Sequence, residues 1–64
     1  MKRATFAAGA TISARELHER TGIYPQLAYA WRKRRNFPRS TDGKYNSGEL
    51  IAWLRNAGYQ IEVI

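Results

Sequence analysis

The chain of 64 residues contains no cysteine and only one histidine. Without thiols it can form neither a disulfide framework nor a thiolate metal site, and one histidine alone cannot make a zinc site. Acidic residues are also few, since five Asp and Glu stand against eleven Lys and Arg, a formal charge of +6. This imbalance favours a polyanionic partner, either nucleic acid or an acidic membrane surface. We expect one small domain that folds by packing alone.

Long apolar runs are absent as well. No segment approaches the roughly 20 apolar residues that cross a bilayer. The N-terminus begins with two cations and small apolar residues, as a signal peptide does, but Thr5, Gly9 and Thr11 interrupt that stretch. A cysteine-free remnant of this size is also unusual for a secreted protein. We therefore expect residues 1–11 to be a flexible arm, the protein to be cytoplasmic, and the membrane not to be a partner.

Capping signals predict two short helices next. Ser13 and Glu16 have the spacing of a capping box at a helix start, and Gly22 suits the left-handed cap that ends such a helix. A second helix begins at Pro25. Proline has no backbone N–H, and in the first turn of a helix that group would have no intrahelical partner anyway. It runs to about Arg34.

The following residues predict a hairpin. Asp42-Gly43 favours a type I′ turn, since both central residues of that turn need a positive φ. We expect short strands at about 38–41 and 44–46, which together form a small β-wing.

The C-terminal part predicts a third helix and a strand. Asn46 and Glu49 repeat the capping-box spacing, and Ala57-Gly58 closes the helix. Its apolar residues exceed one face, so we expect it to be well buried. Residues 59–64 alternate apolar and polar side chains, which predicts a strand that pairs with the wing, with the N-terminal arm or with a second copy of the chain.

The first two helices and their turn have the spacing of a helix-turn-helix. Gln26 can bond an adenine edge in two places, and Tyr29 can contact a base methyl group or a phosphate. A helical hairpin without a nucleic-acid role has the same turn, but the charge of the chain favours DNA. The residues expected at the groove are Tyr24, Pro25, Gln26, Tyr29 and Ala30.

Four adjacent cations end the second helix, and they cannot all point the same way. We expect two to face phosphate and the others to be solvated. The wing adds two more, so the candidate phosphate contacts are Arg32, Lys33, Arg34, Arg35, Arg39 and Lys44. If about five of them touch phosphate, the log–log salt dependence of binding has a slope of roughly −4 to −5.

The remaining reactive side chains predict no catalysis. His18 has no second base or nucleophile nearby in the sequence, and caps, helix pairing and the turn explain the carboxylates. Trp31 and Trp53 could stack on single-stranded bases, but their apolar helical stripes favour core packing. We expect no enzyme activity, no cofactor and no metal.

The segment TISARELHERTGIYPQLAYAWRKRRNFPRS, followed by DGKYNSGELIAWLR, resembles small winged helix-turn-helix proteins of phages and mobile elements. That group includes excisionases, AlpA-type regulators and the DNA-binding part of some terminase small subunits, and it is similar to the N-terminal domain of MerR regulators. The resemblance covers residues 12–55. It implies a mainly α fold with a small β-hairpin, three short helices plus a wing over residues 12–58, with a strand or tail at 59–64.

The resemblance also implies residue roles. The groove is read by Pro25, Gln26 and Tyr29, and backbone and wing contacts come from Arg32, Lys33, Arg39 and Lys44. The chain departs from the family pattern at two positions. Tyr24 replaces the usual Ser or Thr helix cap, and His18 replaces a small residue.

The function we expect is sequence-specific binding of double-stranded DNA by a small phage or mobile-element excisionase or transcription regulator. Its further partners would be copies of itself on DNA, or an integrase or another phage protein. One alternative is a protein-interaction module, such as an antirepressor or polymerase modulator, that uses exposed aromatics and residues 59–64. Others are the DNA-recognition part of a terminase small subunit and, more weakly, an RNA-binding protein.

Overall fold

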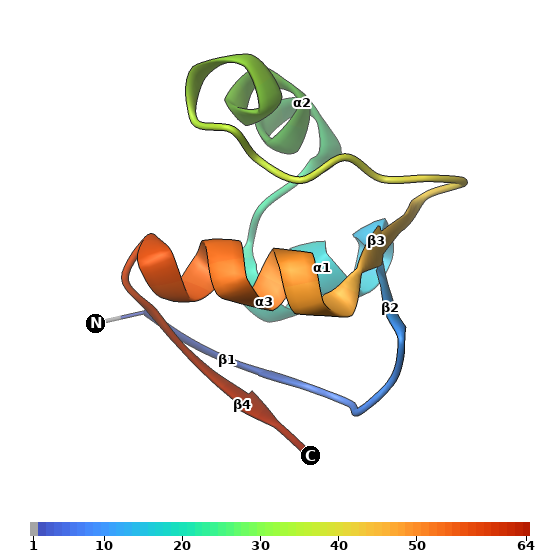
Figure 1. Cartoon of the computed structure of the whole chain (residues 1–64), viewed down its shortest axis with the longest axis vertical. Coiled ribbons are helices and arrows are strands. Elements are labelled where there is room, and N and C mark those ends of the chain that lie inside the picture. Colours follow the sequence, from blue (N-terminus) through green and yellow to red (C-terminus); the bar gives the residue numbers. More distant parts are fainter. Residues whose placement is uncertain (1) are drawn as a thin grey trace.

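The computed structural model describes residues 2–64 of the chain. Within them, four strands and three helices follow one another as shown in Figure 1. The strands are β1 (Lys2–Phe6), β2 (Thr11–Ser13), β3 (Lys44–Asn46) and β4 (Tyr59–Val63). The helices are α1 (Ala14–Thr21), α2 (Pro25–Arg34) and α3 (Ser47–Asn56). None of these helices is both long and apolar enough to cross a membrane.

The strands form two separate two-stranded sheets. β1 and β4 are parallel, from Lys2 opposite Tyr59 to Phe6 opposite Val63. Parallel neighbours need a long crossover connection, and the whole middle of the chain supplies it here. β2 and β3 are antiparallel, with Ile12 opposite Tyr45. Figure 1 shows the β1–β4 pair on one side of α3 and α2 on the other.

The expected mainly α winged helix-turn-helix with three helices and one hairpin is wrong, because the described chain contains two sheets. The predicted turn does form: Asp42 and Gly43 have φ of 53° and 75°, and Thr41 and Lys44 exchange two backbone hydrogen bonds. Residues 38–40, however, form no strand. β3 pairs with β2 instead, since that register buries Ile12 against Tyr45, whereas the expected 38–41 strand has no large apolar side chain to bury.

The N-terminal segment also differs from the expectation of a flexible arm over residues 1–11. Lys2–Phe6 is a strand, and its alternate residues Ala4 and Phe6 are buried while Lys2 and Arg3 are exposed. Only Met1 lies outside the described residues. The strand predicted for the C-terminal residues is confirmed, and of its three expected partners the N-terminal segment is the one observed.

The helix boundaries predicted from caps are confirmed to within a residue or two. Ser13 Oγ accepts a hydrogen bond from the Glu16 backbone N–H at 3.0 Å, and Asn46 Oδ1 accepts one from that of Glu49 at 3.0 Å. Gly22 ends α1 with φ of 81°. The two bonds accepted by Ser13 and Asn46 satisfy backbone N–H groups that have no partner inside the helix.

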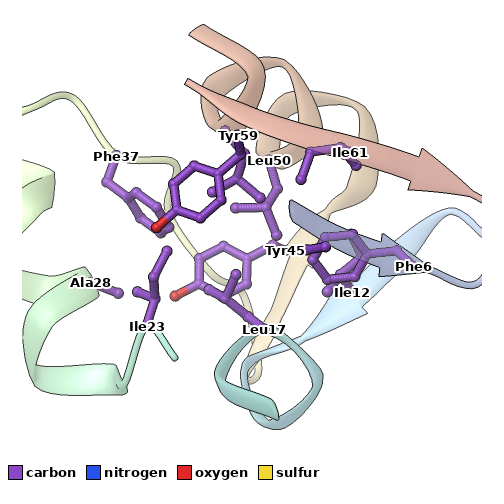
Figure 2. Packing of buried hydrophobic residues seen from close by; sticks show 12 residues of the cluster. Phe6, Ile12, Leu17, Ile23, Ala28, Phe37, Tyr45, Leu50, Tyr59 and Ile61 are labelled. Carbon is purple, nitrogen blue, oxygen red and sulfur yellow. The ribbon is translucent and has the colours of Figure 1, made fainter. Parts of the chain in front are cut away.

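A single hydrophobic cluster joins the two sheets, α1 and α3 (Figure 2). Its fully buried large side chains are Phe6, Ile12, Leu17, Leu50 and Leu54. Figure 2 shows Ala28 and Ile23 at one end of the cluster and Phe6 at the other. Ala28 is the one buried residue of α2, and Leu27 and Trp31 of this helix are only partly buried against the cluster.

Candidate nucleic-acid interface

Aromatic side chains connect α2 to α3. Trp31 and Trp53 stack with their ring centroids 5.6 Å apart, and Phe37 meets Trp53 edge-on at 4.6 Å. The Trp53 indole N–H donates a hydrogen bond to the Arg35 carbonyl oxygen at 2.9 Å. Both tryptophans are half-buried and pack against the core, which agrees with the structural role favoured from the sequence.

A left-handed residue ends α2 and turns the chain back along it. Asn36 has φ of 57°, a conformation that Asn adopts more readily than most residues. The backbone N–H groups of Arg35 and Phe37 both donate to the Trp31 carbonyl oxygen, at 2.7 and 3.2 Å. Phe37 is consequently buried, with 3% of its surface exposed. The loop that follows therefore lies next to α2.

One face of α2 points into solvent. Gln26, Tyr29 and Lys33 lie three and four residues apart, so they share that face, and all three are exposed. Tyr29 is 61% exposed. Tyr24, also exposed, occupies the N-cap position without a side-chain capping bond, as expected from the loss of the usual Ser or Thr.

Two grooves flank the Tyr29–Arg32 pair. The Arg32 guanidinium lies over the Tyr29 ring at 5.3 Å from its centroid. A groove of about 260 Å³ on one side is lined by Tyr29, Arg32, Lys33, Asn36, Phe37 and Arg39. A second, of about 300 Å³, is lined by Ala14, Pro25, Tyr29, Arg32, Ser40, Gly43 and Tyr45. Tyr29 and Arg32 border both, so they form the ridge between the two grooves.

The positive charge of this surface is uncompensated. No carboxylate lines either groove. Between Glu19 and Asp42 the sequence has no acidic residue. The single salt bridge within residues 2–64 joins Arg15 to Glu19 on α1 at 3.0 Å. The potential around the exposed face of α2 is therefore positive.

Tyr45 joins this surface to the core. Burial raises the pKa of its hydroxyl above the ordinary value of 10.0, while the neighbouring Ser40 side chain and the nearby Arg32 guanidinium lower it. The neutral hydroxyl is thus favoured at physiological pH.

The structure brings together only part of the predicted site. Pro25, Tyr29, Arg32, Lys33 and Arg39 line the two grooves, and Gln26 lies on the same exposed face. Tyr24 lies just before this face at the start of the helix.

Three predicted cations lie elsewhere. Arg35 turns back onto the rings of Trp31 and Trp53, at 4.8 and 5.2 Å from their centroids. Arg34, two positions after Arg32, is roughly 160° around the helix from it. Lys44 borders a separate hollow of about 440 Å³, into which Arg39 also reaches and whose lining includes Asp42 and Glu49.

Sequence reasoning missed Asn36, Ser40 and Tyr45 at these grooves. Asn36 lies just beyond the predicted end of the second helix, and its position four residues after Arg32 places it near the same side of the chain. Nothing in the sequence indicated Ser40, because its place depends on how the loop folds over Tyr45.

The described residues contain no group of three His, Asp or Glu that could hold a metal ion. His18 is exposed on α1. The chain matches no family model, and it has no significant match among curated proteins or among solved structures. A functional inference therefore depends on the geometry and charge of the surface around α2.

Proposed function

We propose that this protein binds double-stranded DNA sequence-specifically, as a small excisionase or transcription regulator of a phage or mobile element that acts in the cytoplasm. The observation that carries the proposal is the exposed face of α2, where groups able to read base edges are bordered by cations and the two adjoining grooves are lined by no carboxylate. Ten residues of helix span about 15 Å, which suits insertion of α2 into a major groove roughly 12 Å wide.

Gln26 and Tyr29 are the candidates for sequence selection. A glutamine amide can donate to and accept from an adenine edge at once, and a tyrosine ring can contact a thymine methyl group. Both side chains are exposed on the first two turns of α2. Such contacts are worth about 1–3 kcal/mol of discrimination for each base pair.

Arg32, Lys33 and Arg39 are the candidates for phosphate contacts. They line one groove and have no salt-bridge partner among residues 2–64. The three cations give a log–log salt slope of about −3 if each touches a separate phosphate, and a slope nearer to about −1 if they share one phosphate. Both values are shallower than the slope of roughly −4 to −5 expected if about five of the candidate cations touch phosphate.

Selection of bound duplexes from a random pool, at about 0.15 M ionic strength, tests the proposal. We expect a consensus sequence for the wild type, a relaxed consensus for Gln26→Ala and Tyr29→Ala, and uniformly weaker binding for Lys33→Gln. Arg3→Gln is the matched control, because it removes one exposed charge from β1, on the other side of α3 from α2 (Figure 1). Equal binding by all four variants would contradict the proposal.

A protein-interaction module is the second candidate, and the exposure of Val63 and Ile64 favours it. Deleting residues 59–64 would not test it cleanly, since Tyr59 and Ile61 belong to the core. Val63→Ser and Ile64→Ser keep the backbone pairing of β4. If no duplex binds, and a protein partner that is retained at high salt is lost with these variants but not with the α2 variants, the functional surface is at this end of the molecule.

A further inference from the structure

The geometry assigns a phosphate subsite to the groove between the end of α2 and the loop that follows it. Its polar lining consists of Arg32, Lys33, Asn36 and Arg39, with Tyr29 and Phe37 as aromatic surfaces. The ligand is one oxyanion group, which in the complex is a single phosphate of the DNA backbone. This inference rests on the proposed DNA-binding function and adds the residues that act together on one phosphate.

Two of the four polar residues of this groove, Arg32 and Asn36, are held in place before any ligand arrives. Arg32 is half-buried, and its guanidinium lies against the Tyr29 ring. Asn36 has a fixed left-handed backbone, because the residues on either side of it are hydrogen-bonded to Trp31. Preorganised donors lose little side-chain entropy on binding, and a guanidinium matches two phosphate oxygens at once.

The apolar side of the groove strengthens this recognition. Phe37 is almost completely buried and forms part of the lining. A donor next to an apolar surface is less screened by water, so its interaction with an anion is stronger than on an open surface. The volume of about 260 Å³ is several times the roughly 30 Å³ that one water occupies, which leaves room for a tetrahedral group and some of its water.

Charge argues for an anion in the same place. Three cations and no carboxylate line the groove, so their mutual repulsion is unrelieved in the free protein. Arg35 is a cation from the same basic run, but its guanidinium faces two indole rings and it does not line this groove. It therefore supplies a matched control of equal charge, four residues from Arg39.

The test is a methylphosphonate scan of a duplex recovered from the random pool, in which each backbone phosphate is neutralised in turn. We expect one phosphate whose neutralisation weakens wild-type binding by up to about fivefold. With Arg39→Gln or Lys33→Gln, the loss of binding on neutralising that phosphate should be smaller than in the wild type. With Arg35→Gln the fivefold loss should remain.

A second measurement separates the subsite from the proposed function. Inorganic phosphate is titrated into the free protein at constant ionic strength, and the amide resonances of Asn36 and Phe37 are followed by NMR, with those of β1 and β4 as a folding control. We expect shifts at Asn36 and Phe37 in the wild type that are reduced in Arg39→Gln.

Each combination of results decides between the two inferences. A duplex that binds with no phosphate coupled to Arg39 or Lys33 would overturn the subsite and leave DNA binding intact. If no duplex binds and phosphate still shifts Asn36, the subsite stands as a site for free phosphate and the DNA proposal fails. If no duplex binds and phosphate shifts neither Asn36 nor Phe37, both the phosphate subsite and the DNA-binding proposal are wrong.

Discussion

Two regions of this molecule are built in different ways. The body (residues 2–23 and 42–64) contains both sheets, α1, α3 and ten of the twelve buried core residues, whereas the α2 segment (residues 24–41) contributes only Ala28 and Phe37. Charge is divided in the opposite sense: the segment has five cations and no acid, and the body has six cations and five acids. Stability is therefore concentrated in one region and the candidate binding surface in the other.

The largest effect we predict is the unfolding of the body by a single core substitution. Phe6 is 0% exposed, and truncating a buried Phe costs about 3–5 kcal/mol. That loss approaches the whole stability of a small domain, which starts at about 5 kcal/mol. We expect Phe6→Ala to be largely unfolded in thermal or urea unfolding followed by circular dichroism.

The control is Val63→Ala, opposite Phe6 in the sheet but 48% exposed. It should change the free energy of unfolding by no more than about 0.5 kcal/mol. If Phe6→Ala unfolds at the same midpoint as this control, β1 is not part of the stabilising body.

The same division explains which elements could be predicted from the sequence. Caps and helix lengths depend on neighbours within a few residues, so Ser13, Pro25 and Asn46 indicated their helices correctly. The pairing of Lys2 with Tyr59 depends on residues at opposite ends of the chain. β1 has only two buried side chains, so its local sequence pattern is too weak to indicate that it pairs with β4.

The candidate site was predictable to a similar extent. The helix-turn-helix spacing predicted that Gln26 and Tyr29 face outward, and both are exposed on α2. It could not show that Arg35 turns onto Trp53, because Trp53 belongs to α3 and its approach depends on tertiary packing. The loop residues at the grooves depend on the observed β2–β3 pairing, which replaces the expected wing.

The next effect loosens the α2 segment alone. Trp53→Phe keeps an aromatic ring but removes the indole N–H that bonds the Arg35 carbonyl oxygen, a loss of about 1 kcal/mol. We expect faster hydrogen exchange at the backbone amides of Arg35 and Phe37, with little change in β1 and β4. Trp31→Phe is the control, since its indole N–H has no hydrogen bond among the described residues. Equal acceleration throughout the chain would show that the two regions unfold as one.

A smaller effect separates two neighbouring cations within the segment. Lys33→Gln should reduce the magnitude of the salt slope for duplex binding by up to about 1 and leave stability nearly unchanged. Arg35→Gln should leave that slope unchanged and reduce stability by about 0.5–1 kcal/mol, because it removes a cation from two indole rings. Fluorescence anisotropy at several salt concentrations and urea unfolding measure the two quantities. The reverse pattern would assign Arg35 to phosphate.

The smallest effect lies where the two regions meet, at Tyr45. Its pKa is raised by burial, so the folded state holds the phenolic proton more tightly than the unfolded chain. This stabilisation is fully present below pH 10 and is lost as the pH rises through the folded pKa. Comparing free energies of unfolding near neutral pH and at about pH 11, we expect the wild type to lose more stability than Tyr45→Phe.

Ser40→Ala, in the α2 segment, tests the same alkaline loss of stability through a neighbour of Tyr45. The neighbouring Ser40 hydroxyl lowers the pKa of Tyr45 and so opposes the effect of burial. Removing it should raise the folded pKa further, and the alkaline loss of stability should then exceed that of the wild type. If Ser40→Ala and the wild type lose stability equally, the loop does not hold Ser40 against Tyr45 in solution. The α2 segment would then be held by Ala28 and Phe37 in the core and by its contacts with Trp53 of α3.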